Sequence, residues 1–333
     1  MRFILTIISV HLLAIALLIG GGTVWVWHSY HAPGPLTEEK TVIVPPGYGV
    51  AMIADKLEKE GVVEQPLLFR FMARVTGRQS GLKAGEYAFD AHLSMKGVLD
   101  LLESGKVVQR SLTIREGLTS FEVIQILKNA PELSGDIDEN QPEGSLLPET
   151  YSYQKDEARD AVALRMKEAM TRTLDELWES RDEDLPFTTK EEALVLASIV
   201  EKETAVAGER NRIAGVFVNR LRKGIALQTD PSVIYALTGG KPENKGKGPL
   251  GRRLLKKDLE VDSPYNTYLY PGLPPGPIAN PGRAAIEAAL HPEENDFLFF
   301  VADGTGGHVF AKTLEEHNAN VAQWRKIRSQ QKK

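Results

Sequence analysis

A long apolar segment at the N-terminus constrains this chain more than any other feature. The residues from Phe3 to Trp27 are nearly all apolar. A helix of roughly 25 residues, rising about 1.5 Å per residue, crosses a hydrocarbon layer about 30 Å thick with some tilt. Trp25, Trp27 and Tyr30 are placed to form an aromatic belt at the outer interface. The sequence therefore predicts a membrane anchor within residues 1–30.

The orientation of this anchor follows from the charges at its short end. Arg2 and the α-amino group are positive, which favours the cytoplasmic side, so the chain after about His31 is expected outside the cytoplasmic membrane. A cleaved signal peptide is the alternative, but its apolar region is normally shorter and ends in an A-x-A-like site. No clean site of this kind follows here. We therefore predict a single-pass protein of the inner (cytoplasmic) membrane.

Charge and cysteine content exclude several classes of function. The chain of 333 residues has a formal net charge of −5, so no basic field favours nucleic acid as a partner. It contains no cysteine, which excludes disulfides, thiolate catalysis and zinc–thiolate sites. Its length allows about two domains.

A weak internal repeat follows a Pro/Gly-containing linker at 31–40. Val42–Leu57 and Leu112–Leu127 each indicate a strand, a turn at a glycine and a helix. Short helices and strands between the two copies predict a small α+β module at 41–110. Its size suits a glycan-binding LysM-like unit. A spacer that lifts the remainder off the membrane is an equally good interpretation.

The rest of the chain divides into a connecting region at 111–158, which is loop-rich, and a larger domain at 159–333. The domain opens with a predicted amphipathic helix, Ala158–Ser180, that carries a broad apolar stripe. Further helices are expected at about 209–223, 231–237, 282–290 and 314–328.

Two local patterns complete the expected fold. Thr189 and Glu192 form a capping box before the apolar run Ala193–Val200. Phe297–Ala302 and His308–Ala311, separated by a glycine-rich turn, predict a hairpin. The fold class is therefore α+β, with a helical core and a short antiparallel sheet in the larger domain.

One carboxyl group lies on the apolar face of the helix that begins after Thr189. Its core stripe, counted at i, i+3, i+4 and i+7 from Leu196, ends at Glu203. Burial there favours the neutral acid and raises its pKa, as a general acid requires. A structural ion pair with Arg210 or Arg212 is the alternative.

Polar loops surround this helix in the sequence. LQTDPSVIY (227–235), SPYNTY (263–268), GLPPGPIANPG (272–282) and DGTGGHVF (303–310) combine neutral hydrogen-bonding groups and aromatic rings on a stiff backbone. Such loops suit a sugar-binding groove, although each alone is equally typical of an ordinary turn. The candidate contacts are Gln228, Thr229, Tyr265, Asn266 and Asn280.

Together with ERNRIAGVFVNRL (209–221) and EHN (316–318), these strings resemble the endolytic murein transglycosylases of the MltG (YceG-like) family. The resemblance covers nearly the whole chain and is densest from Leu196 to Asn318. It implies cleavage of the MurNAc–GlcNAc bond in nascent peptidoglycan, and cell-wall synthases as partners. The family's essential glutamate, the second in EKE, corresponds to Glu203.

The resemblance also implies a mechanism with one carboxylate. Glu203 would protonate the glycosidic oxygen and then act as base on the sugar's own C6 hydroxyl, giving a 1,6-anhydro end. Because the attacking hydroxyl is tethered, high effective molarity replaces an activated water. A hydrolysing glycosidase usually needs a second carboxylate.

Three further residues are candidates with competing interpretations. Asp230 can supply a second carboxylate, but because it precedes Pro231 it is better interpreted as a helix N-cap. Arg220 can hold a substrate carboxylate or cap its own helix. His308 can orient Glu203, line the groove or simply pack.

Other chemistry is not indicated. The loop Lys241–Lys257 carries seven basic residues against Glu243; it can steer acidic stem peptides, although a solvated loop is the simpler interpretation. No metal site is expected, since His308 and His317 share no face with a nearby carboxylate. No cofactor is expected either: there is no phosphate loop or dinucleotide fingerprint, and no lysine has the context of a pyridoxal site. The alternatives to a lytic transglycosylase are a hydrolysing muramidase and a non-catalytic peptidoglycan-binding scaffold.

Overall fold

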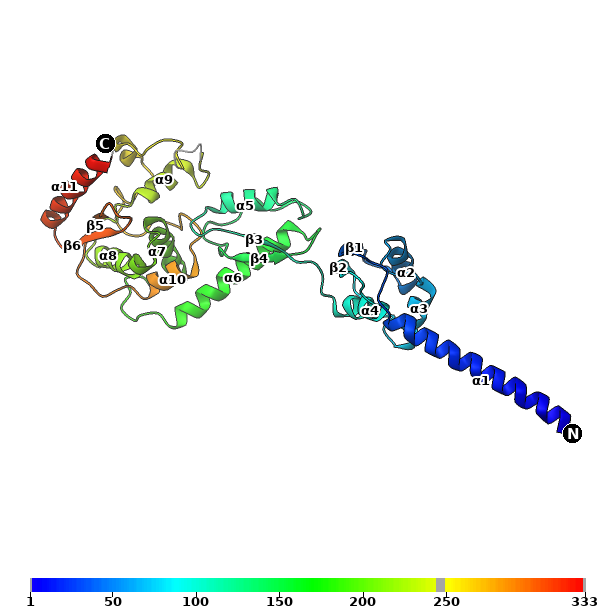
Figure 1. Ribbon diagram of the computed structural model, residues 1–333. Helices are drawn as coiled ribbons and strands as arrows, with labels where there is room; N and C mark the ends of the chain where they lie inside the picture. Colours follow the sequence, from blue (N-terminus) through cyan, green and yellow to red (C-terminus); the bar gives the residue numbers. More distant parts are fainter. Residues whose placement is uncertain (1, 244–248, 332–333) are drawn as a thin grey trace. The chain divides into compact units, whose positions relative to one another are not determined.

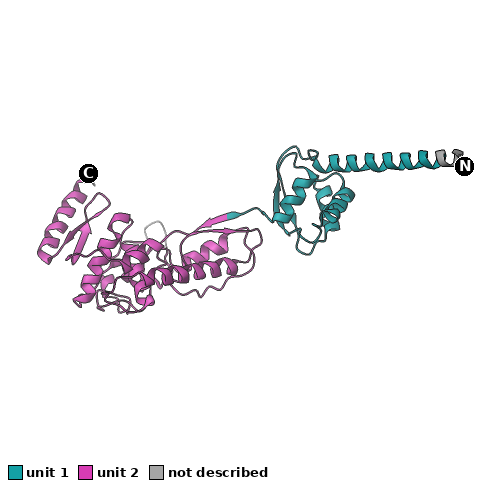
Figure 2. Ribbon diagram, turned by 90° about the horizontal axis from the view of Figure 1, so that it is seen from below, with its two compact units in different colours: residues 1–110 teal, residues 111–333 magenta. Residues whose placement is uncertain are grey.

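The computed structural model describes residues 2–243 and 249–331. The chain forms two compact units, residues 1–110 and 111–333, which Figure 2 shows in different colours. Helices and short strands alternate in both units, so the predicted mixed α+β class is confirmed.

Unit 1 begins with the helix α1 (Arg2–His31). Its segment Ile7–His31 is long and apolar enough to cross a membrane, with a mean hydropathy of 2.2, and it is not covered by the rest of the chain. The last turn of α1 is different, because Tyr30 belongs to the core of unit 1. Leu36, in the stretch predicted as a linker, also packs into this core.

The rest of unit 1 is a small α+β module. Strand β1 (Lys40–Val44) pairs antiparallel with β2 (Gly85–Phe89), with Val42 opposite Tyr87. Helices α2 (Val50–Lys59), α3 (Pro66–Val75) and α4 (Met95–Ser104) enclose the core. The element order is β-α-α-β-α; the likeness to a LysM unit stays a prediction.

Unit 2 begins with a second strand–turn–helix, as the internal repeat predicts. Strand β3 (Arg110–Thr113) is followed by α5 (Ser120–Asn129), and β3 pairs with β4 (Thr150–Tyr153). The turns at Gly47 and Gly117 both have positive φ, of 81° and 75°. This left-handed conformation is available to glycine without strain. A core cluster under α5 also receives side chains from α6 (Arg159–Glu179).

The remaining helices form the core of unit 2 (Figure 1). They are α7 (Lys190–Glu203), α8 (Arg210–Arg222), α9 (Asp230–Thr238) and α10 (Arg283–Leu290), with short 3-10 helices at Ala207–Glu209 and Lys256–Glu260. Helix α7 packs against α6, α8, α9 and α10. The predicted capping box at Thr189 and Glu192 is confirmed.

The C-terminal part carries the predicted hairpin. Strands β5 (Phe299–Ala302) and β6 (His308–Ala311) pair antiparallel, with Phe299 opposite Ala311. Helix α11 (Leu314–Gln331) packs on this hairpin. The ring of Phe300 in β5 also meets that of Phe217 in α8, with centroids 5.9 Å apart.

Candidate functional site

The site is organised around the last residue of α7. The residues from Leu196 to Val200 are buried in the core of unit 2. The helix ends at Glu203, and Thr204 is already extended, with φ −143° and ψ 135°. The predicted stripe therefore carries the Glu203 side chain to the edge of the core, where part of its surface stays open to a cavity.

This cavity has a volume of about 400 Å³. Its lining combines polar and charged side chains with aromatic rings, among them two from β5 and one from α11. The lining residues are Glu203, Phe217, Arg220, Leu227, Gln228, Asp230, Tyr268, Phe299, Phe300, Leu314 and His317.

A buried hydroxyl group holds the Glu203 carboxyl. The Oγ1 of Thr229 donates a hydrogen bond to Glu203 Oε1. The backbone of Thr229 is also fixed, because its N–H donates a hydrogen bond to Thr267 Oγ1 over 3.1 Å. Thr267 Oγ1 also lies 2.8 Å from Ser232 Oγ. Glu203 is therefore fixed by a chain of buried hydroxyls.

The surroundings raise the pKa of Glu203 above its ordinary value. Burial is the largest cause, since it disfavours the charged carboxylate, and the negative charge of Asp230 adds to it. The Thr229 hydrogen bond and the charges of His308 and Arg220 act in the opposite direction. The net result is a carboxyl group that stays protonated to higher pH than a solvated glutamate, as general acid catalysis requires.

Asp230 lies in the same cavity but does not cap α9. The helix begins at Asp230, its N-cap residue is Thr229, and no side-chain cap hydrogen bond is formed. The expectation that Asp230 caps the helix is therefore wrong by one residue. Its carboxylate instead accepts a hydrogen bond of 2.7 Å from the hydroxyl of Tyr268.

Arg220 forms part of the cavity wall and also holds its loops. Its Nε donates to the carbonyl of Leu298 over 2.6 Å, and its Nη1 donates to the carbonyls of Ala226 and Leu227. The guanidinium lies 5.1 Å from the ring centroid of Phe299. Arg220 thus connects the strand β5 with the segment that leads to Gln228 and Thr229.

Two predicted contacts lie in the interior instead. Asn266 and Asn280 are both 0% exposed. Asn266 donates to the carbonyls of Leu259 and Val261. Asn280 accepts from the backbone N–H of Leu146 and donates to the carbonyl of Leu118. In this conformation neither amide is accessible to a substrate, because the surrounding backbone occupies its hydrogen-bonding groups.

Tyr265 and His308 are not among the residues that line the cavity. Tyr265 packs on Tyr235, with 4.8 Å between ring centroids. His308 Nδ1 lies 2.8 Å from Glu209 Oε2, and its backbone N–H donates to the other oxygen of that carboxylate. Its hydrogen bond thus goes to Glu209 and not to Glu203, so His308 reaches Glu203 only through its charge.

The expected alternative role of Glu203, an ion pair with a neighbouring arginine, is not observed. Arg210 pairs with Glu116 at 3.6 Å, and Arg212 pairs with Glu293 at 2.8 Å. Both arginines are thus engaged away from Glu203.

Comparison with known proteins identifies the family of this chain. A family model described as the YceG-like family matches residues 42–323. This chain belongs to the YceG-like family.

The YceG-like chain has relatives with named activities. It is 32% identical over 315 residues to the endolytic murein transglycosylase of Bacillus subtilis, covering 84% of each protein. It is 32% identical to the protein of that name from Streptococcus pneumoniae D39, covering 85% of this chain and 58% of the relative. A crystal structure of a YceG-like protein from Listeria monocytogenes is 33% identical, with a TM-score of 0.50 over 85% of this chain and 99% of that one.

Sequence reasoning on this YceG-like chain missed seven of the residues that line the cavity: Phe217, Leu227, Tyr268, Phe299, Phe300, Leu314 and His317. Tyr268 belongs to the SPYNTY string, from which Tyr265 and Asn266 were selected instead. The ring of His317 stacks on that of Phe299, with centroids 5.2 Å apart. Burial and the charge of Arg220 lower the pKa of His317. Tyr268 and His317 lie in the strings SPYNTY and EHN, and Phe299 lies in the first strand of the predicted hairpin, but spacing alone did not show which rings face the cavity.

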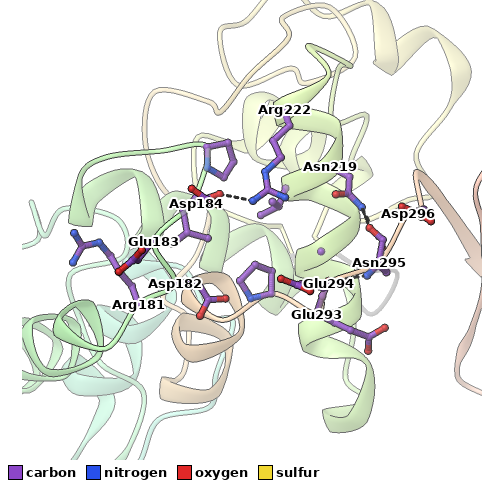
Figure 3. A pocket seen from close by; sticks show the side chains of 15 residues that line it. Arg181, Asp182, Glu183, Asp184, Asn219, Arg222, Glu293, Glu294, Asn295 and Asp296 are labelled. Carbon is purple, nitrogen blue, oxygen red and sulfur yellow. Dashed lines mark hydrogen bonds between the residues drawn. The ribbon is translucent and has the colours of Figure 1, made fainter.

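A second hollow of the YceG-like chain, drawn in Figure 3, has a volume of about 1240 Å³, and Glu203 is not among its lining residues. Its walls carry six carboxylates against two arginines: Asp182, Glu183, Asp184, Glu293, Glu294 and Asp296 against Arg181 and Arg222. Arg222 donates to the carbonyl of Asp184, as Figure 3 shows. The Glu203 cavity is smaller, but it is the one that holds a carboxyl group with a raised pKa beside a fixed donor.

The basic loop Lys241–Lys257 falls partly outside the described residues, since 244–248 are not among them. In its described part, Arg252 binds the carboxylate of Asp258 over 2.6 and 3.0 Å. Within the described ranges, no group of three or more His, Asp or Glu side chains is arranged to hold a metal ion.

Proposed function

We propose that this chain is an endolytic lytic transglycosylase that cuts MurNAc–GlcNAc bonds within peptidoglycan glycan strands. The observation that carries the proposal is the desolvated carboxyl group of Glu203, held by Thr229 at the wall of a cavity. The names of the Bacillus and Streptococcus relatives supply the substrate class.

Glu203 acts twice in the proposed reaction. As an acid it gives its proton to the glycosidic oxygen while the bond from C1 to that oxygen breaks. As a carboxylate it then takes the proton of the C6 hydroxyl of the same sugar, and the C6 oxygen bonds to C1. No water is consumed, and the product carries a 1,6-anhydro ring. Tethering of the C6 hydroxyl replaces the activated nucleophile of a hydrolase.

The other cavity residues bind and position the sugar. The rings of Tyr268 and Phe299 offer apolar faces on which a pyranose can pack. Gln228 is exposed at the rim, and its φ of 51° is a left-handed conformation that is uncommon for a residue other than glycine. Strain of this kind is often kept where a side chain must point into a site.

The larger hollow is a poorer site for this substrate. Peptidoglycan stem peptides are acidic, and six carboxylates would repel them. In the Glu203 cavity the positive charge of Arg220 offsets the negative charge of Asp230.

The proposed location of the protein in the cell follows from the helix α1. We propose that α1 spans the cytoplasmic membrane and that unit 2 works on its outer side, where nascent glycan strands and the cell-wall synthases are expected as partners. The length and hydropathy of Ile7–His31 support the span.

The decisive experiment compares wild type, Glu203→Gln and Glu201→Gln on purified uncrosslinked glycan. Loss of a general acid typically lowers the rate about 10²–10⁴-fold, and this is expected for Glu203→Gln. Glu201 is the matched control: it lies on the same helix and its Oε2 accepts from the N–H of Gly282, which a glutamine oxygen can also do. Equal turnover of wild type and Glu203→Gln, with equal melting temperatures, would remove the proposal.

A hydrolysing muramidase is the second candidate, because Asp230 places another carboxylate in the same cavity. The two reactions differ by one water in the product, so mass spectrometry of the glycan ends separates them. A lytic enzyme gives anhydro ends and keeps forming them after Asp230→Asn. A hydrolase gives reducing ends and loses them in that variant.

A further inference from the structure

Helix α3 exposes an apolar stripe that the fold of unit 1 does not use. Leu67, Phe71 and Val75, at positions i, i+4 and i+8, are 75%, 52% and 63% exposed. The opposite face of α3 is buried in the core through Leu68, Phe69, Met72 and Ala73. A solvated helix on the surface of a module normally carries polar residues on its outer face. Helix α3 is instead apolar on both faces, which is typical of a surface that another apolar phase covers.

Direct packing places this stripe beside the last turns of the apolar run of α1. Phe71 and Met72 enclose an apolar hollow of about 320 Å³ together with five residues of α1: Ile19, Gly22, Thr23, Val26 and Trp27. These residues are the last turns of the apolar run. Phe71 therefore lies beside the part of α1 that would cross the boundary between hydrocarbon and headgroups.

The attachment of α1 to the module is rigid at this point. Tyr30 is 4% exposed within the core, and α1 packs against both α3 and α4. The chain leaves the helix with a hydrogen bond of 2.7 Å from the N–H of Ala32 to the carbonyl of His28. The module accordingly cannot move away from the end of α1 without breaking its own core.

Basic side chains accompany the apolar stripe. Arg70 and Arg74 lie on α3 between its exposed apolar residues, and Arg74 is exposed. Arg70 pairs only loosely with Asp55, at 3.9 Å between nitrogen and oxygen. Apolar side chains interleaved with arginines are typical of helices that lie in the plane of a membrane interface, where the guanidinium groups meet phosphates.

We propose that the Leu67–Phe71–Val75 stripe docks on the phospholipid surface of the same bilayer that α1 spans. The inference rests on the proposed span of α1 and does not depend on the catalytic activity. The module would then be held flat on the membrane by two attachments, the spanning helix and the inserted stripe. Its orientation relative to the bilayer would be fixed, while unit 2 follows as a separate body.

The absence of cysteine makes a direct test simple. Single cysteines replace Phe71 or Val75, carry a nitroxide label, and are studied in the full chain reconstituted in vesicles of phosphatidylethanolamine and phosphatidylglycerol. Leu18→Cys on α1 is the hydrocarbon reference, and Gln109→Cys, an exposed position of unit 1, is the water reference. Accessibility to oxygen and to a water-soluble nickel chelate is measured by power saturation.

We expect the oxygen-to-nickel accessibility ratio at 71 and 75 to be several-fold higher than at 109 and to approach that at 18. A ratio at 71 and 75 equal to that at 109, with position 18 in hydrocarbon, would overturn the docking and leave the span intact. A water-like ratio at 18 would overturn the span and the docking together. Spin–spin broadening at 71 that disappears on dilution with unlabelled protein would show that a second copy covers the stripe, and would also overturn the proposal.

Discussion

The amide of Asn280 is expected to contribute to stability and not to substrate binding, and its replacement by alanine tests this. Asn280 Oδ1 accepts from Leu146 N–H over 2.9 Å, and Nδ2 donates to the carbonyl of Leu118 over 3.0 Å. The Nδ2 also lies 3.3 Å from the half-buried carboxylate of Glu143. In the alanine variant the N–H of Leu146 loses its partner inside the protein.

The expected loss of unfolding free energy in Asn280→Ala follows from these contacts. A buried donor left without a partner costs about 1–3 kcal/mol, and each lost hydrogen bond about 0.5–1.5 kcal/mol. We therefore expect Asn280→Ala to lower the free energy of unfolding of unit 2 by about 3 kcal/mol. For a body of this size that corresponds to a fall in Tm of about 6–12 °C.

The assay is thermal unfolding of the full chain, combined with turnover measured well below the lower transition. Asn129→Ala is the matched control, since Asn129 is exposed and makes a single bond of 2.8 Å to the carbonyl of Gln125; its effect should stay below about 0.5 kcal/mol. Turnover per folded Asn280→Ala molecule should equal that of wild type. An unchanged Tm together with a large loss of turnover would refute the reasoning and return Asn280 to the substrate contacts.

Two further predictions concern the pH profile and the packing. Thr229 lowers the pKa of Glu203, and Asp230 raises it. The alkaline limb of the kcat/KM profile reports loss of the acid's proton, so it should move to higher pH in Thr229→Val and to lower pH in Asp230→Asn. Shifts of the two variants in the same direction would contradict the assignment of that limb to Glu203. A Cβ added at Gly215 would lie 2.3 Å from the carbonyl oxygen of Glu293, whereas one at Gly208 would meet nothing within 4 Å. Gly215→Ala should therefore destabilise unit 2 by about 1–3 kcal/mol, with Gly208→Ala close to neutral in the same melting experiment, and equal melting temperatures for the two would show that α8 can shift away from Glu293.

Regular periodicity made the helices and the place of Glu203 predictable. The apolar repeat from Leu196 carries Glu203 to the edge of the core because an α-helix has one fixed period. The capping box at Thr189 was predictable because its two residues have a fixed spacing, and the hairpin because a glycine-rich turn separates two short strands. Thr229 was predicted as a sugar contact, whereas its hydroxyl is buried and holds the Glu203 carboxyl.

Loops have no such period, and there the prediction was less successful. Tyr265 and Tyr268 are three residues apart in an irregular turn, and only Tyr268 faces the cavity. Asn266 and Asn280 have the composition of sugar contacts, but their amides satisfy buried backbone groups of segments distant in sequence. The pair of Glu209 and His308 joins residues 99 positions apart, which no local pattern shows.

The two residues before Glu203 bind the end of α7 to two separate turns of unit 2. Glu201 accepts from the N–H of Gly282, and Lys202 Nζ donates to the carbonyl of Gly117 over 2.9 Å. The turn that enters α5 and the turn that enters α10 are thus clamped to consecutive residues of one helix end. A displacement of either turn is therefore transmitted to the end of α7, where Glu203 is the next residue along the chain.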